Sequence, residues 1–121
     1  MAKRILIVDD DELVLMALRE LLKSQHYEVQ TFSRGSEALK KLDQETFDLM
    51  ILDIVMPEMD GFELCKKIRE KPAGKGTPII FLSAKNQEED QKRGIEVGAN
   101  LFLSKPISPQ RLLALIADVL G

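Results

Sequence analysis

Polar side chains that could do chemistry stand at the ends of four short apolar runs in this sequence. The runs end at Asp9 and Asp10, at Asp53, at Ser83 and at Lys105. A carboxylate that attacks in line, with an ammonium and a hydroxyl that stabilise charge on the transferred oxygens, can accept a phosphoryl group. We therefore predict that Asp53 is the nucleophile, that Ser83 and Lys105 assist it, and that the product is an aspartyl phosphate.

Three carboxylates at one place repel one another. At about 4 Å and an effective dielectric constant of about 20, each pair costs roughly 4 kcal/mol. Either one carboxyl group stays protonated, or a hard dication binds, and Mg²⁺ prefers a few carboxylates together with water and phosphate oxygens. The second solution predicts a magnesium site at Asp9, Asp10 and Asp53. Without the ion, the three groups should titrate as a coupled set.

The elements that must bring these groups together follow from the apolar pattern. Apolar runs that indicate strands alternate with segments of helical periodicity. The predicted strands are 3–8, 27–32, 50–52, 78–82 and 101–103, and the predicted helices are 13–22, 36–42, 62–70, 87–97 and 109–119. This alternation predicts an α/β fold, (βα)5, with a doubly wound five-stranded parallel sheet. The strand order that we expect, 2-1-3-4-5, is the one of flavodoxin-like proteins. The carboxyl ends of parallel strands share one edge, where the polar groups can meet.

Helix-start signals support these bounds. Asp11 favours the beginning of the first helix through the helix dipole. Ser36 is predicted to cap the second helix and Asp60 the third, and Ser108-Pro109 is a typical opening for the fifth.

Composition restricts the class of protein. The chain has 121 residues, 45% of them apolar and 31% charged, which predicts one folded domain over 1–121 with no output domain on this chain. No apolar run could span a bilayer, and Asp9 interrupts the first one too early for a signal peptide, so we expect a soluble cytoplasmic protein. The net charge is −3 with dispersed basic residues, which argues against direct binding to nucleic acid. The one cysteine, Cys65, is expected to serve packing.

Four motifs resemble those of response-regulator receiver domains of two-component signalling. They are ILIVDD at 5–10, ILDIVMPEMDGFEL at 51–64, PIIFLSA at 78–84 and GANLFLSKP at 98–106. Each motif is weak alone, but all four occur in order and cover essentially the whole chain. The resemblance implies a signalling switch rather than an enzyme, with self-phosphorylation and slow autodephosphorylation as its only chemistry.

The resemblance also implies a role for each site residue. Asp53 corresponds to the phosphoacceptor, and Asp9 and Asp10 correspond to the pair that holds Mg²⁺ together with Asp53 and the backbone carbonyl of Val55. Lys105 corresponds to the lysine that contacts the phosphate, and the peptide bond to the proline that follows it is commonly cis in the family.

Two positions correspond to the switch residues of the family. Ser83 supplies the switch hydroxyl, and Phe102 occupies the aromatic switch position, where the family often has tyrosine. Without a phenol, Phe102 cannot donate a hydrogen bond to the chain against which it packs, so an ordinary core role stays open for it. Val55 and Lys85 occupy variable positions that tune how fast the phosphoryl group is lost.

The implied partners are proteins. A histidine kinase or histidine phosphotransfer protein would meet the first helix and the loops around Asp53 and Lys105. An output protein or domain, or a second copy in a homodimer, would meet the face formed by the fourth helix, the fifth strand and the fifth helix.

Other functions remain open at this point. A haloacid-dehalogenase-like phosphatase would need a second acid two residues after the nucleophile, where this chain has Val55. A flavin or nucleotide module would need backbone donors where Asp9, Asp10 and Asp11 would repel a phosphate, and no GxxxxGK or GxGxxG is present. A phosphorylation-independent binding module would be indicated by the loss of a site residue, and none is lost. Taken singly, the acids at 9–10 could be helix-start residues and Lys105 a surface lysine.

Overall fold

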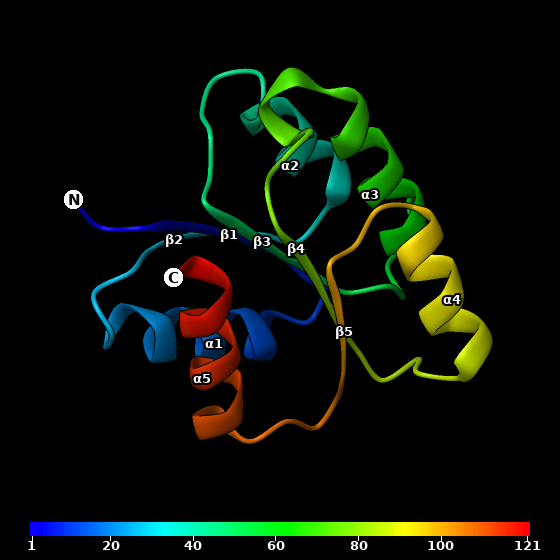
Figure 1. The fold of residues 1–121 in the computed structure, drawn as a ribbon. Helices are drawn as coiled ribbons and strands as arrows, with labels where there is room; N and C mark the ends of the chain where they lie inside the picture. The colour runs from blue at the N-terminus through cyan, green and yellow to red at the C-terminus, as the bar shows by residue number, and fades with distance from the viewer.

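A parallel sheet lies at the centre of the molecule. The computed structural model describes residues 1–121, and Figure 1 shows the five strands crossing the molecule between two groups of helices. The strand order β2-β1-β3-β4-β5 confirms the predicted topology. The elements are β1 (Arg4–Val8), α1 (Glu12–Lys23), β2 (Glu28–Phe32), α2 (Gly35–Lys41), β3 (Leu49–Leu52), α3 (Gly61–Glu70), the short 3₁₀ helix η1 (Pro72–Gly74), β4 (Ile79–Ser83), α4 (Glu88–Glu96), β5 (Leu101–Ser104) and α5 (Pro109–Leu120).

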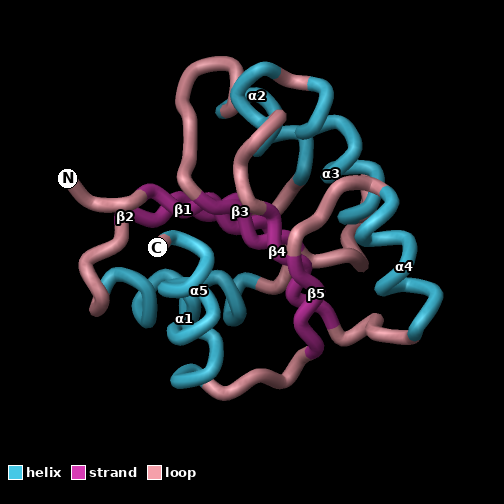
Figure 2. Tube along the Cα trace, viewed as in Figure 1, coloured by secondary structure: helices cyan, strands magenta, loops and turns pink.

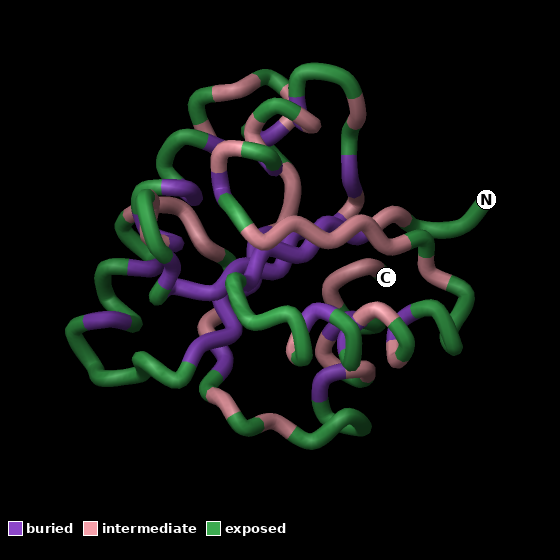
Figure 3. The backbone as a smooth tube through the Cα atoms, turned by 180° about the vertical axis from the view of Figure 1, so that it is seen from behind, coloured by how far each residue is buried: buried purple, intermediate pink, exposed green.

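The sheet is covered on both faces, which explains the continuous apolar runs. Helices α1 and α5 lie on one side and α2, α3 and α4 on the other (Figure 2). In β1, Ile5 and Ile7 pack into the core under α1 and α5, whereas Leu6 and Val8 pack into the core under α2 and α3. Strands buried on both faces do not alternate between apolar and polar residues. In Figure 3 the central strands are mostly buried and exposed residues lie along the helices.

Helix α4 packs on the sheet differently from the other long helices. Its only buried residues are Asp90 and Gly94, and its large apolar residue Ile95 is exposed. A Cβ atom at Gly94 would lie 3.2 Å from the rings of both Phe81 and Phe102. The missing side chain therefore lets the helix lie directly against the two rings.

The prediction that Ser36 caps the second helix was wrong. The helix begins at Gly35 with Arg34 at the cap position, and no side chain caps it. Gly35 is buried, and a Cβ atom there would come within 3.3 Å of Leu64 and Met59, so the first residue of α2 packs closely against α3. Ser36 consequently lies inside the first turn.

The other helix-start predictions were confirmed. Asp11 accepts hydrogen bonds from the backbone of α1, Asp60 from that of α3 and Ser108 from that of α5.

Cys65 is fully buried, as a packing role requires. None of the helices has the length and apolar character needed to cross a membrane.

Gly61 should be essential for the loop that presents Asp53. Its N–H donates to the Ile54 carbonyl at 2.8 Å, and a Cβ atom would clash with the Asp53 carbonyl oxygen and lie 2.8 Å from the Ile54 Cα. We expect Gly61→Ala to lower the free energy of unfolding by about 1–3 kcal/mol, as overpacking does. Urea unfolding followed by circular dichroism measures this. Gly76→Ala is the matched control because no atom lies within 4 Å of its Cβ position, and equal losses in both variants would contradict the argument.

Candidate functional site

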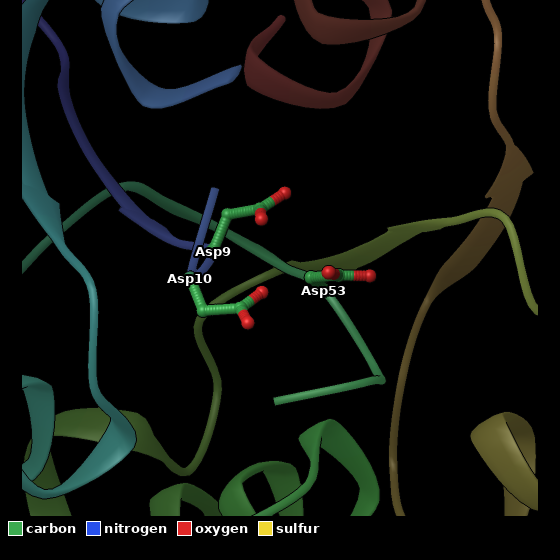
Figure 4. A group of neighbouring side chains, drawn as sticks. All are labelled: Asp9, Asp10 and Asp53. Carbon is green, nitrogen blue, oxygen red and sulfur yellow. The ribbon is translucent and has the colours of Figure 1, made fainter. Parts of the chain in front are cut away.

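Three carboxylates converge at the carboxyl edge of the sheet. Asp9 and Asp10 follow β1, and Asp53 follows the neighbouring strand β3. Figure 4 shows the three side chains extending from these two strand ends. One oxygen from each lies within 4.8 Å of the others. Asp9 and Asp53 are only 3% and 8% exposed, while Asp10 is open to solvent.

Lys105 supplies the positive charge at this cluster. It follows β5, and its Nζ lies 2.7 Å from Oδ2 of Asp9 and 3.7 Å from Oδ2 of Asp53. Its backbone N–H donates to the Ser83 carbonyl at 3.0 Å, which fixes the start of the loop. The peptide bond between Lys105 and Pro106 is cis, in agreement with the resemblance.

Ser83 is the last residue of β4 and is buried next to the acids. Its Oγ accepts a hydrogen bond from the Lys85 N–H at 3.2 Å, and its hydroxyl is one of the groups that favour the ionised form of Asp53. The structure therefore brings together Asp9, Asp10, Asp53, Ser83 and Lys105, as the sequence predicted from strand ends alone.

The environment of Asp53 opposes its ionisation. Burial raises the pKa of Asp53, and the charge of Asp9 raises it further, while Lys105 and the Ile54 N–H, which donates to Oδ1 at 2.8 Å, oppose the rise. For Lys105, burial alone would lower the pKa, but the hydrogen bond to Asp9 and the charge of Asp53 raise it above its usual value. The lysine is therefore charged, and the acidic cluster keeps an excess of negative charge.

The donor set fits a hard dication. All three side-chain donors are carboxylate oxygens, the ligands that Mg²⁺ prefers, and there is no sulfur or imidazole among them. Val55 lies in the loop after β3 with 61% of its surface exposed, two residues beyond Asp53. Its carbonyl as a fourth protein ligand stays a prediction.

Phe102 packs inside the molecule rather than standing free. It lies on β5 with its ring half-buried and its centroid 5.9 Å from that of Phe81. The ring also lies beside Gly94 of α4. Phe102 thus touches both β4 and α4, and it is not brought among the acids.

One buried charged residue near the site was missed from the sequence. Asp90 is 7% exposed, and its carboxylate pairs with Lys85, in the loop after Ser83. The surrounding sequence is strongly polar, and no residue of the predicted helix 87–97 was singled out for a role. The sequence offered no usual signal, because the capping box pairs Gln87 with Asp90, whereas the common pattern is Ser or Thr followed three residues later by Glu or Gln.

Comparison with known proteins identifies the family. The model of the response regulator receiver domain matches residues 5–117. The chain belongs to this family. Receiver domains are the switch modules of response regulators in two-component systems, so the resemblance read from the four motifs is confirmed. Members of this family act as signalling switches.

Individual relatives agree with this assignment. The receiver domain is 41% identical over 120 residues to the alkaline phosphatase synthesis transcriptional regulatory protein PhoP of Bacillus subtilis, covering 99% of this chain and 49% of PhoP. It thus spans about half the length of the curated relatives it matches first.

Solved structures show the same fold over the whole chain. Chemotaxis protein CheY4 of Vibrio cholerae superposes with a TM-score of 0.94 at 36% identity, covering 98% of this chain and 99% of that one. The receiver domain of sensor histidine kinase PA1611 of Pseudomonas aeruginosa, with a magnesium ion in its active-site cleft, superposes with a TM-score of 0.91 at 26% identity, covering 100% and 99%.

The raised pKa of Asp53 predicts that the site destabilises the fold near neutral pH. The stability contributed by a group with a raised acid pKa is complete below its ordinary value of 3.8 and is lost as the pH rises through the raised value. Asp53→Asn should therefore be more stable than the unchanged chain at about pH 7 without metal.

Urea unfolding between about pH 4 and about pH 7 measures this difference, which should shrink toward acid. Asp118→Asn, an exposed acid on α5, is the control and should show no such trend. A variant less stable than the unchanged chain at neutral pH would refute the electrostatic argument.

Proposed function

We propose that Asp53 accepts a phosphoryl group from a phosphohistidine on a histidine kinase or a histidine phosphotransfer protein. The observation that carries the proposal is the Lys105 ammonium, held at 2.7 Å from Asp9 and 3.7 Å from Asp53 inside a cluster of three acids. This arrangement places a nucleophile beside a cation that can bind the oxygens of a transferred group.

The transfer uses one oxygen of Asp53. Oδ1 accepts the Ile54 N–H, and Oδ2 faces Lys105, so we assign the attack on phosphorus to Oδ2. The new O–P bond forms as the P–N bond of the phosphohistidine breaks, and the electron pair of that bond returns to the ring nitrogen. Lys105 and the Ser83 hydroxyl then hydrogen-bond oxygens of the phosphoryl group.

The reaction should require Mg²⁺ held by Asp9, Asp10 and Asp53 with the Val55 carbonyl. The carboxylate cluster supports this, as does the magnesium ion in the related Pseudomonas receiver domain. When bound, the ion would reduce the electrostatic repulsion between the acids and the phosphoryl oxygens.

Phosphorylation should act as a switch through Ser83 and Phe102. Ser83 can exchange its contact with the Lys85 N–H for one with the phosphoryl group. Phe102 lies between β4 and α4, so a movement of Ser83 at the end of β4 could change its packing. We propose that the output protein or domain, or a second copy in a homodimer, binds the face of α4, β5 and α5. The kinase would meet α1 and the loops around the site, in the cytoplasm.

Acetyl phosphate tests the phosphoryl transfer without a kinase. Intact-protein mass should show the gain of one phosphoryl group in the presence of Mg²⁺ and no gain without it. Asp53→Asn should show no gain, because the nucleophile is missing, while the control Asp118→Asn should behave as the unchanged chain. A phosphorylated Asp53→Asn protein would exclude this residue as the acceptor.

Asp10 gives the sharpest test of the metal site because it is exposed and its replacement leaves the core intact. Asp10→Asn should weaken Mg²⁺ binding by at least about tenfold, since it removes one charged ligand. With no tryptophan and one tyrosine in the chain, amide NMR or calorimetric titration is the suitable measurement. An unchanged dissociation constant, with Asp118→Asn as reference, would remove Asp10 from the ligand set.

A further inference from the structure

Lys85 is attached to the site through its backbone. It is the second residue after Ser83, and its N–H donates to Ser83 Oγ at 3.2 Å. An ammonium on a flexible four-carbon stem at this position is a potential second cation for the acidic cluster. The cluster has three carboxylates and one lysine counterion, so its field attracts such a group.

The Lys85 ammonium is instead directed to α4. Its Nζ lies 3.3 Å from Oδ1 of Asp90, whose side chain is 9% exposed. The other oxygen of Asp90 accepts the Gln87 N–H at 3.1 Å, and the Gln87 side chain completes the capping box with the Asp90 backbone. Both carboxylate oxygens are therefore committed, and the acid is held in one place at the beginning of the helix.

Two carboxylate sites therefore compete for the Lys85 ammonium. One is the cluster of three acids, and the other is Asp90. If Lys85 moved to the cluster, it would neutralise part of the charge that the metal requires. The Asp90 carboxylate is buried and also accepts a backbone hydrogen bond, so it is held more firmly in place than the exposed Asp10. Lys85 therefore pairs with Asp90.

We propose that Asp90 is a positioning residue that keeps the Lys85 ammonium away from the metal-binding acids. The inference rests on the proposed magnesium-dependent function and adds a residue to it. Asp90 touches neither metal nor phosphoryl group and acts only through Lys85. Without Asp90, the ammonium becomes a competitor of Mg²⁺.

A double-mutant cycle on Mg²⁺ affinity tests this, with Asp90→Asn, Lys85→Met and both together. Asparagine can still accept the Gln87 N–H, so the capping contact is kept while the ion pair is lost. Amide NMR titration with Mg²⁺ should show binding about three- to fivefold weaker in Asp90→Asn, the range expected for one exposed charge interaction. In the Lys85→Met background, the same Asp90→Asn change should have no effect.

The cycle separates positioning from a merely structural role. A distorted α4 would weaken binding equally in both backgrounds, and that result would overturn the proposal, as would unchanged affinity in Asp90→Asn. If the unchanged chain binds no Mg²⁺ while Asp53 is still phosphorylated, the metal requirement and this inference both fall. If the unchanged chain binds Mg²⁺ but the cycle shows no coupling, only the role of Asp90 is refuted.

Discussion

The contact between Lys105 and Asp9 is the interaction on which the rest of the site depends. It joins residues 96 positions apart in sequence and connects the ends of β5 and β1, which are separated in the sheet by β3 and β4. Asp9 and Asp53 are buried, and two buried acids on adjacent strands could not both stay ionised without a neighbouring cation. Breaking such a pair by removing one partner typically costs about 3–5 kcal/mol. The lysine thus makes an acidic edge compatible with a folded sheet.

Most of the fold and of the site could be predicted because both follow from one-dimensional patterns. Strands buried on two faces appear as continuous apolar runs, and the carboxyl ends of parallel strands must share an edge. The convergence of Asp53, Ser83 and Lys105 is therefore a consequence of topology. The convergence of the site residues could be predicted without knowledge of any side-chain contact, whereas the order of the strands followed from the likeness to flavodoxin-like proteins.

The remaining features depend on side-chain contacts that the apolar pattern does not contain. Helix α2 begins at Gly35, which packs against Leu64 of α3, a contact that no local capping rule contains. Asp90 is buried although its helix has a strongly polar composition, and its contacts are with Lys85 and Gln87, just before it in the chain. Local propensity predicted the wrong start for α2 and did not predict the burial of Asp90.

The weak apolar anchoring of α4 bears on the proposed switch. Helix α1 buries Leu15, Leu18 and Leu22, so detaching it would expose a large apolar surface. Helix α4 buries only Asp90 and Gly94, and it lies on the rings of Phe81 and Phe102 through a residue without a side chain. Elements that bury little apolar surface open at lower free energy than the core. A phosphoryl group can shift an equilibrium only by its preference between two states, so the element that responds must be one whose states differ by a few kcal/mol. Because α4 buries less apolar surface than α1, it is the better candidate of the two for the element that responds.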